Sequence, residues 1–230
     1  MNSRIFCAID TPSMSEAVKL AEQLREHVAG LKVGLEFYSA NGPEGMKAIH
    51  AKGLPVFLDL KLHDIPNTVA NTIAALLPLG PHFITLHASG GPAMMKAAAE
   101  AARKGGDSRP KLLAVTVLTS LDTADLKLIG FDADASAQVL RLAMLARDSG
   151  MDGVVCAPTE IELLRRELGP DFILMVPGIR PTSAAANDQK RVMTPKEAVS
   201  AGATYLVVGR PITQKLDPAA AAAAINAEVA

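Results

Sequence analysis

Two acids and a lysine interrupt an otherwise apolar run at residues 57–66. If this run is a strand, its period of two residues places Asp59 and Lys61 on one face and the neighbouring leucines on the other. Opposite charges that share an enclosed space must pair, because an unpaired buried charge is costly. A lysine held by a carboxylate in this way is arranged to act as a proton donor.

Two further charged residues can reach the same place. Lys32 lies in the apolar run at residues 31–34, and Asp64 follows Lys61 near the end of its run. In the array Lys32, Asp59, Lys61 and Asp64, each partly desolvated ion stabilises its neighbours and keeps Lys61 charged until a proton is needed. A structural ion-pair network at the rim of the fold is the alternative. This alternative applies most to Asp64, because its position depends on where the strand ends.

A second group of residues has the character of a phosphate site. Gly209 and Arg210 follow one apolar run, and Pro177 begins a glycine turn after another. Backbone N–H groups in such turns can approach a phosphate closely, and an arginine adds a bidentate, charge-assisted contact. Arg180 and Gln189 lie in the long segment after Pro177 and could close over the same anion. Plain turns are the alternative interpretation.

The composition is that of one α/β domain. The chain has 230 residues, of which 49% are hydrophobic and 20% are charged, so we expect residues 1–230 to form a single domain with a full core. The formal net charge is −1, with 23 basic and 24 acidic residues, which provides no field for gathering nucleic acid or an anionic membrane. Any anion must therefore be bound locally.

The N-terminus and the cysteines predict a cytoplasmic protein. The apolar run at residues 5–9 is too short for the core of a signal peptide, and no later stretch is long enough to span a bilayer. Cys7 and Cys156 each lie within an apolar run, which favours two buried thiols over a disulfide or a nucleophile. A reducing compartment fits both observations.

Short apolar runs alternate with segments of helical pattern along the chain. The runs are nearly continuous in hydrophobicity, which is typical of strands covered on both faces. Eight strands are predicted, at residues 5–9, 31–34, 55–60, 82–87, 111–118, 153–156, 172–176 and 205–208. Helices are expected at residues 15–28, 44–52, 68–77, 93–104, 136–149 and 159–168, and after the capping sequences Thr194-Pro195 and Asp217-Pro218.

Eight such β-α units predict a closed (β/α)8 barrel, also called a TIM barrel, with its chemistry at the carboxyl ends of the strands. An open doubly wound sheet is the main competitor, but Asp10-Thr11-Pro12 stands where a dinucleotide-binding fold has its glycine-rich loop. The longer connections at residues 119–136 and 181–194 are interpreted either as lids or as plain surface loops. The histidines show no metal-ligand spacing, so no metal is expected.

Five motifs occur in order along the chain. They are Leu31-Lys32-Val33-Gly34, Asp59-Leu60-Lys61-Leu62-His63-Asp64-Ile65-Pro66-Asn67-Thr68, Val115-Thr116-Val117-Leu118-Thr119-Ser120, Pro177-Gly178-Ile179-Arg180-Pro181 and Val208-Gly209-Arg210-Pro211-Ile212. In these motifs the chain resembles the orotidine 5′-phosphate decarboxylase family along essentially its whole length. The motif in the third strand is fairly specific by itself.

The resemblance implies decarboxylation of orotidine 5′-monophosphate to uridine 5′-monophosphate in pyrimidine synthesis, without a metal or an organic cofactor. It implies that Lys61 donates the proton to C6 of the pyrimidine and that Asp59 is the acid beside the departing carboxylate. Asp10 and Lys32 match groups that contact the ribose, and Lys32 also belongs to the charge array.

The same resemblance assigns the remaining binding residues. Asp64 and Thr68 match residues that family members insert into the partner subunit's site, which implies a homodimer with shared active sites. The region that reads the pyrimidine edge is matched by Thr119 and Ser120. The other substrate-binding residues, most of them in the phosphate-binding set, are Pro177, Arg180, Gln189, Gly209 and Arg210.

Other functions stay open. A magnesium-dependent sugar-phosphate decarboxylase or lyase of the same barrel superfamily shares the Asp-x-Lys-x-x-Asp strand, although its second strand offers an acid to the metal, where Lys32 would repel one. A non-catalytic nucleotide-binding barrel would use the same charges only to hold a ligand. A phosphate-binding isomerase leaves the motif at Thr119-Ser120 unexplained.

Overall fold

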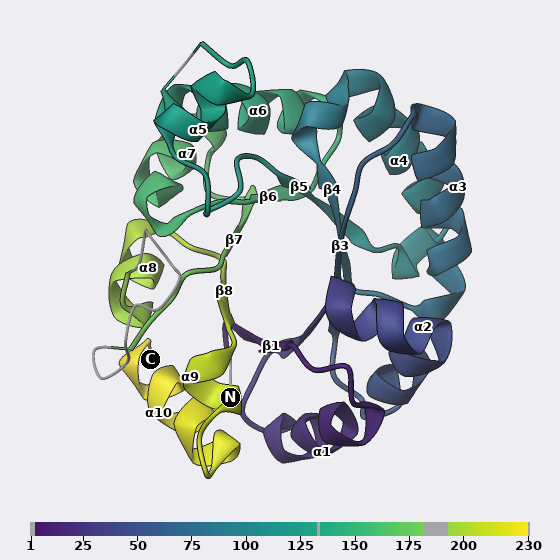
Figure 1. Ribbon diagram of the computed structural model, residues 1–230, viewed down its shortest axis with the longest axis vertical. Helices are drawn as coiled ribbons and strands as arrows, with labels where there is room; N and C mark the ends of the chain where they lie inside the picture. The colour runs from purple at the N-terminus through teal and green to yellow at the C-terminus, as the bar shows by residue number, and fades with distance from the viewer. Residues whose placement is uncertain (1–2, 133, 182–192, 230) are drawn as a thin grey trace.

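The computed structural model describes residues 3–132, 134–181 and 193–229, and it shows a closed barrel of eight parallel strands (Figure 1). Each strand pairs with the next along the chain, and β8 pairs with β1 to close the ring. The predicted (β/α)8 barrel is therefore confirmed. The strands are β1 (Ile5–Ile9), β2 (Gly30–Gly34), β3 (Val56–Leu62), β4 (Phe83–His87), β5 (Lys111–Val115), β6 (Gly153–Val155), β7 (Ile173–Val176) and β8 (Tyr205–Val208).

Helices cover the outside of the barrel (Figure 1). The α-helices are α1 (Met14–Leu24), α2 (Leu35–His50), α3 (Pro66–Leu76), α4 (Gly91–Arg103), α5 (Thr123–Leu128), α6 (Ala135–Asp148), α7 (Ile161–Leu168), α8 (Pro195–Ala201), α9 (Arg210–Thr213) and α10 (Pro218–Glu228). Short 3-10 helices are η1 (Leu77–Leu79), η2 (Ala88–Gly90), η3 (Gly106–Ser108) and η4 (Pro158–Glu160). Within the described ranges, no helix has the length and apolar character needed to cross a membrane.

The helix starts expected from the sequence have their capping hydrogen bonds. At α8, the Thr194 side chain accepts a hydrogen bond from the backbone N–H of Glu197, and the Glu197 carboxylate accepts one from the N–H of Thr194. At α10, the Asp217 side chain accepts from the N–H of Ala220 at 3.0 Å. These bonds satisfy N–H groups that have no partner within the helix.

Apolar side chains pack in two layers, one inside the barrel and one between the strands and the helices. Phe6, Phe57 and Phe83 come from β1, β3 and β4 and meet edge to face inside the barrel, with ring centroids 5.4 to 6.2 Å apart. Alternate residues such as Ile5 and Leu58 belong to the outer layer. This burial on both faces explains why the strand sequences are continuously hydrophobic. The inner layer fills the barrel below the carboxyl ends of the strands.

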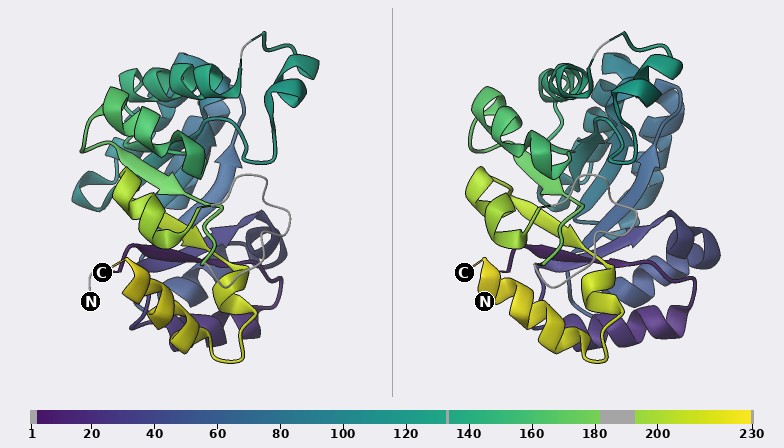
Figure 2. Two further views of the ribbon diagram at one scale, coloured as in Figure 1. Left: turned by 90° about the vertical axis from the view of Figure 1, so that its left-hand side faces the viewer. Right: turned by 60° about the vertical axis from the view of Figure 1, so that its left-hand side comes forward.

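The connection after β5 differs from the prediction. The strand ends at Val115, whereas the apolar pattern predicted an end at Leu118. The following segment, expected to be a lid or a plain loop, contains α5, which projects on the side to which the strands point (Figure 2). The capping box of Asp122 and Asp125 stabilises this helix. Its six residues were too few to show a helical hydrophobic period in the sequence.

Two helices also begin or occur where the sequence pattern did not place them. Helix α2 starts at Leu35, well before the expected residue 44. It bends at Gly42, which has a φ of 56° and is followed by Pro43. Glycine and proline both disfavour a helix interior, and here they lie at the bend. Helix α9 follows β8 directly and was not expected. Both cysteines are buried and free, as predicted.

Candidate active site

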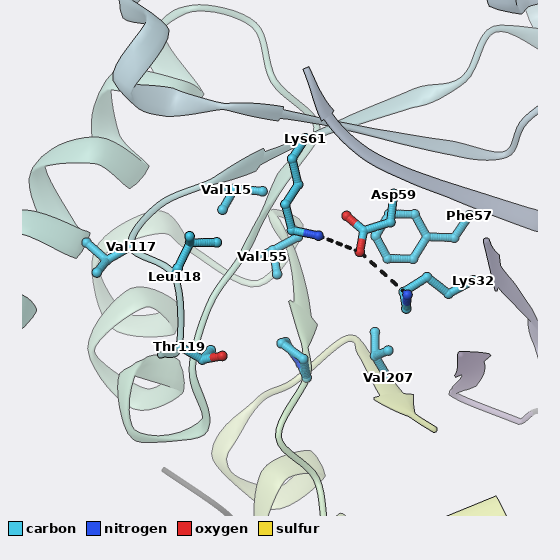
Figure 3. Close-up of a pocket in the computed structure, with 11 residues that line it drawn as sticks. Lys32, Phe57, Asp59, Lys61, Val115, Val117, Leu118, Thr119, Val155 and Val207 are labelled. Atoms are coloured by element: carbon cyan, nitrogen blue, oxygen red, sulfur yellow. Dashed lines mark hydrogen bonds and ion pairs between the residues drawn. The ribbon is translucent and has the colours of Figure 1, made fainter. Parts of the chain in front are cut away.

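Charged side chains alternate in sign at the carboxyl ends of β1, β2 and β3. Lys61 Nζ lies 2.9 Å from Oδ2 of Asp59, and Lys32 Nζ lies 3.7 Å from the same oxygen (Figure 3). Lys32 Nζ also lies 3.3 Å from Oδ1 of Asp10. The lysine side chains are 31% exposed at Lys61 and 11% exposed at Lys32. Lys61 is therefore the cation with better access to a ligand.

The backbone at Lys61 departs from a regular strand. Leu58 pairs with Ile84 and Leu62 pairs with Leu86, so that four steps along β3 run beside two steps along β4. Among the non-glycine residues of the described ranges, only Lys61 has a positive φ, at 51°. That conformation costs on the order of 1 kcal/mol or more. The predicted pairing of Asp59 with Lys61 is confirmed, but the regular strand alternation behind it is wrong, because the strand bulges here.

Thr85 on β4 contacts both residues of this pair. Its Oγ1 accepts a hydrogen bond from the backbone N–H of Lys61 at 2.9 Å and donates one to Oδ1 of Asp59, also at 2.9 Å. The residue is fully buried. Sequence reasoning missed Thr85, because a β-branched residue in an apolar strand signals only that it fits a sheet.

The environment of Asp59 keeps its carboxyl group ionised. Burial raises the pKa, but the charges of Lys32 and Lys61 and the hydrogen bonds from Lys61 and Thr85 together lower it below its ordinary value. The carboxylate therefore remains negative at neutral pH although only 8% of the residue is exposed.

We expect Asp59 to contribute to the loss of stability in acid. A carboxyl group whose pKa is lowered by folding stabilises the fold above its unfolded pKa of about 3.9, and this contribution is lost as the pH falls through the lower folded value. Each unit of lowering corresponds to about 1.4 kcal/mol. In urea denaturation, Asp59→Asn should be less stable than the unsubstituted protein at pH 7, with a difference that shrinks below about pH 4.

A matched control for this experiment is Glu44→Gln. Glu44 forms an ion pair with Lys47, but its side chain is 78% exposed, so solvent screens the interaction. This variant should follow the unsubstituted protein at every pH. A stability difference for Asp59→Asn that stays constant down to pH 2 would contradict the role given to its ionisation.

The charged residues border a cavity of about 160 Å³ at the mouth of the barrel. Lys61 and Lys32 converge on Asp59, while Val115 and Leu118 lie to one side as part of an apolar wall (Figure 3). The cavity thus sets an ammonium and a carboxylate beside apolar surface, which is suited to a flat, partly apolar ligand. Its full lining is Lys32, Phe57, Asp59, Lys61, Val115, Val117, Leu118, Thr119, Val155, Pro177 and Val207.

Among the residues predicted to bind a substrate, Thr119 and Pro177 line this cavity, together with Lys32. Ser120 is exposed outside the lining. The valines from β5, β6 and β8 were not assigned to the site from the sequence. Their signal was weak, because inward-facing valines are ordinary barrel residues.

Three of the residues predicted to bind phosphate, Arg180, Gly209 and Arg210, are not part of the cavity lining. A Cβ atom on Gly209 would lie 3.7 Å from Oδ2 of Asp10, so the turn after β8 adjoins the lysine cluster through Asp10. Arg210 is partly exposed at the start of α9. The buried Arg180 donates from Nη1 to the backbone oxygen of Ile179 at 2.9 Å. Gln189, like most of residues 181–194, lies outside the described residues.

Asp64 and Thr68 face solvent. Oδ1 of Asp64 accepts a hydrogen bond from the backbone N–H of Ile65 at 2.6 Å, whereas the ion-pair partner of Lys61 is Asp59. The predicted array of four charges is therefore incomplete within one chain. Asp64 follows the end of β3 and is not part of the cavity lining.

Two histidines, one just after β3 and one at the last residue of β4, lie close to each other. The rings of His63 and His87 have centroids 5.2 Å apart. Burial, followed by the charges of His63 and Lys61, lowers the pKa of His87. Among the described residues, no group of three or more His, Cys, Asp or Glu side chains is arranged to hold a metal ion.

Comparison with known proteins gives a consistent result. The sequence model of the "Orotidine 5'-phosphate decarboxylase / HUMPS family" matches residues 3–225. A protein of Paramagnetospirillum magneticum named orotidine 5′-phosphate decarboxylase is 52% identical over 233 residues, covering 100% of this chain and 99% of the relative. One from Moorella thermoacetica with the same name is 47% identical over 231 residues, covering 98% and 92%.

Solved structures agree with the sequence comparison. The crystal structure of orotidine 5′-phosphate decarboxylase from Lactobacillus acidophilus has a TM-score of 0.89 at 40% identity and covers 99% of both chains. The structure of the enzyme from Pyrococcus horikoshii OT3 has a TM-score of 0.79 at 24% identity, covering 98% of both chains, and shows the shared fold.

Proposed function

The chain belongs to the orotidine 5′-phosphate decarboxylase / HUMPS family, and we propose that Lys61 is the proton donor in its reaction. Relatives 52% and 51% identical over essentially their whole length are named orotidine 5′-phosphate decarboxylase. The protein accordingly converts orotidine 5′-monophosphate to uridine 5′-monophosphate and CO2 in pyrimidine synthesis. The observation that carries the assignment to Lys61 is the position of its Nζ, 2.9 Å from Asp59 at the edge of an apolar cavity.

The proposed chemistry is electrostatic stabilisation followed by proton transfer. The bond between C6 and the carboxylate breaks, CO2 leaves, and the electron pair stays on C6 of the pyrimidine. The Lys61 ammonium faces this developing negative charge and then donates its proton to C6, leaving a neutral amine that regains a proton from solvent. Asp59 holds the ammonium in place beforehand, so that little reorganisation accompanies the reaction.

The remaining residues of the site anchor the substrate. Asp10 and Lys32 are proposed to contact the ribose, and Thr119 with Ser120 reads the pyrimidine edge. At the end of the site away from C6, the phosphate is bound by Arg180, Gln189, Gly209 and Arg210. Binding energy at the phosphate, remote from C6, can support catalysis through closure of the segment at residues 181–194. The support for this arrangement is that Asp10 lies between Lys32 and Gly209.

We propose that the active protein is a homodimer in which Asp64 and Thr68 enter the partner's site. Both are exposed in the single chain, and between them lies Ile65, which is 67% exposed. Leu118 and Ile129, which follow β5, are also exposed. Apolar surface around the mouth of the barrel is what a second copy of the chain would cover.

We propose that catalysis is independent of metal, which the position of the two lysines supports. Lys32 and Lys61 both contact Oδ2 of Asp59, so a divalent cation at this carboxylate would meet two positive charges. The same argument disfavours a magnesium-dependent sugar-phosphate decarboxylase or lyase. We also propose that residues 1–230 act as one cytoplasmic domain without a nucleic-acid or membrane partner, supported by the net charge of −1 and two free thiols.

The experiment that tests this function is to mix the protein with orotidine 5′-monophosphate in the presence of a chelator. We expect the ultraviolet absorbance of the orotate ring to fall as uridine 5′-monophosphate forms. No change with this substrate, together with turnover of a keto-sugar phosphate that the chelator removes, would instead support the sugar-phosphate enzyme. Binding of uridine 5′-monophosphate without turnover would support a non-catalytic barrel.

A further inference from the structure

We propose that Thr85 is a positioning residue for the decarboxylation, because its hydroxyl fixes Asp59 and the backbone of Lys61 in one arrangement before substrate arrives. Thr85 lies outside the cavity lining and is fully buried on β4, so it acts on the reaction only through these two neighbours. The kinetic consequence rests on the proposed function of Lys61.

The chemistry of the three groups determines the direction of both hydrogen bonds. The backbone N–H of Lys61 can only donate, so Oγ1 of Thr85 accepts from it at 2.9 Å. The single hydroxyl proton is then directed to Oδ1 of the ionised Asp59, also at 2.9 Å. A side chain that lacks either a donor or an acceptor cannot make both contacts.

These contacts close a ring through Lys61. Its backbone N–H is held by Thr85, Thr85 holds one oxygen of Asp59, and the other oxygen of Asp59 holds Nζ of Lys61 at 2.9 Å. The catalytic side chain is thus fixed at both ends by the same pair of residues. A closed ring leaves the ammonium fewer alternative positions than a single ion pair would allow.

Thr85 also lies beside the bulge in β3. It is the residue between Ile84 and Leu86, the two places where β4 pairs with β3 on either side of the bulge. At the bulge the N–H of Lys61 bonds to a side-chain oxygen, and Lys61 has a φ of 51°. The threonine hydroxyl therefore supplies an acceptor to a backbone segment that has left the regular ladder.

The test compares Thr85→Val with Thr85→Ser and a matched control, Thr204→Val. Thr204 accepts a hydrogen bond from the backbone N–H of Leu174 at 3.0 Å and contacts Nη2 of Arg165 at 3.1 Å, just before β8 begins. It therefore joins a backbone N–H to a charged side chain as Thr85 does, but at the opposite end of the barrel.

With orotidine 5′-monophosphate as substrate, Thr85→Val should lower kcat about 10- to 100-fold and change KM less than about threefold, because only the reacting end is displaced. Thr85→Ser should keep kcat within about threefold, and Thr204→Val should leave it unchanged. Thr85→Ala replaces the valine variant if that protein does not fold. A valine or alanine variant with kcat within threefold of the unsubstituted protein would overturn the proposal, as would a folded serine variant that is equally impaired.

A second measurement does not depend on turnover. Hydrogen exchange of the Lys61 amide, followed by NMR on the ligand-free protein, should be faster in Thr85→Val than in the unsubstituted protein or in Thr204→Val. Equal exchange in all three would overturn the proposal. If the unsubstituted protein did not decarboxylate orotidine 5′-monophosphate, the proposed function would fail, while the exchange rates would still decide whether Thr85 holds Lys61.

Discussion

Replacing Lys61 by alanine should abolish decarboxylation while leaving the binding of uridine 5′-monophosphate detectable. In the proposed mechanism, the substitution removes both the charge that stabilises the electron pair on C6 and the proton that this carbon receives. Loss of these two contributions together should reduce kcat by at least about 10⁴-fold. Single-turnover decay of orotate absorbance measures the rate, and titration calorimetry with uridine 5′-monophosphate measures the binding that remains.

Two companion variants separate the possible causes. Lys52→Ala makes the same change in a lysine that pairs with Glu22 at 2.7 Å on the outside of the fold, and it should keep full activity. Lys61→Arg retains a positive charge, but a guanidinium does not release its proton in proteins. Turnover above about 1% of the original rate in Lys61→Ala would show that another group donates the proton.

Mixing two inactive variants should restore activity if Asp64 serves the partner's site. In a dimer of one Lys61→Ala chain and one Asp64→Asn chain, one site carries both substitutions and the other carries neither. Random pairing makes about half of the dimers hybrid, so the mixture should recover about a quarter of the original activity. The measurement is kcat of co-expressed, differently tagged chains, compared with each variant alone.

The control for this experiment pairs Lys61→Ala with Asp59→Asn. Lys61 and Asp59 contact each other within one chain, so a hybrid dimer has a defect in each of its sites and should stay inactive. Purification through both tags in succession establishes that hybrids are present. Hybrids of Lys61→Ala and Asp64→Asn that are present yet inactive would place Asp64 in its own chain's site or outside the site altogether.

Much of the fold could be predicted because barrel strands are buried on both faces. The run at residues 205–208 shows this best, since its apolar pattern and the observed strand β8 coincide. The pattern failed at Val117 and Leu118, where apolar residues continue past the end of β5 and line the cavity. Helix α5 is held by its capping box, and six residues show too little of a helical period to reveal it.

The sequence could predict only those site residues whose side-chain type is itself unusual in an apolar strand. Charges in an apolar strand are rare enough to mark Asp59, Lys61 and Lys32 at once. Thr85 carries no comparable signal, because its contribution depends on a bulge that brings the N–H of Lys61 to its hydroxyl. The place of Asp64 could not be read from one chain either, since its expected partner belongs to another.

At Lys61, the backbone conformation and the proposed catalytic role favour different residue types. Glycine is the residue that adopts a φ of 51° without steric penalty, so the backbone favours glycine where the proposed mechanism requires an amine. Lys61→Gly would relax the backbone, but it would also remove the ion pair with Asp59 and the proposed proton donor. Two requirements therefore hold a lysine at position 61 against the local backbone preference: the ion pair with Asp59 and the proposed proton transfer.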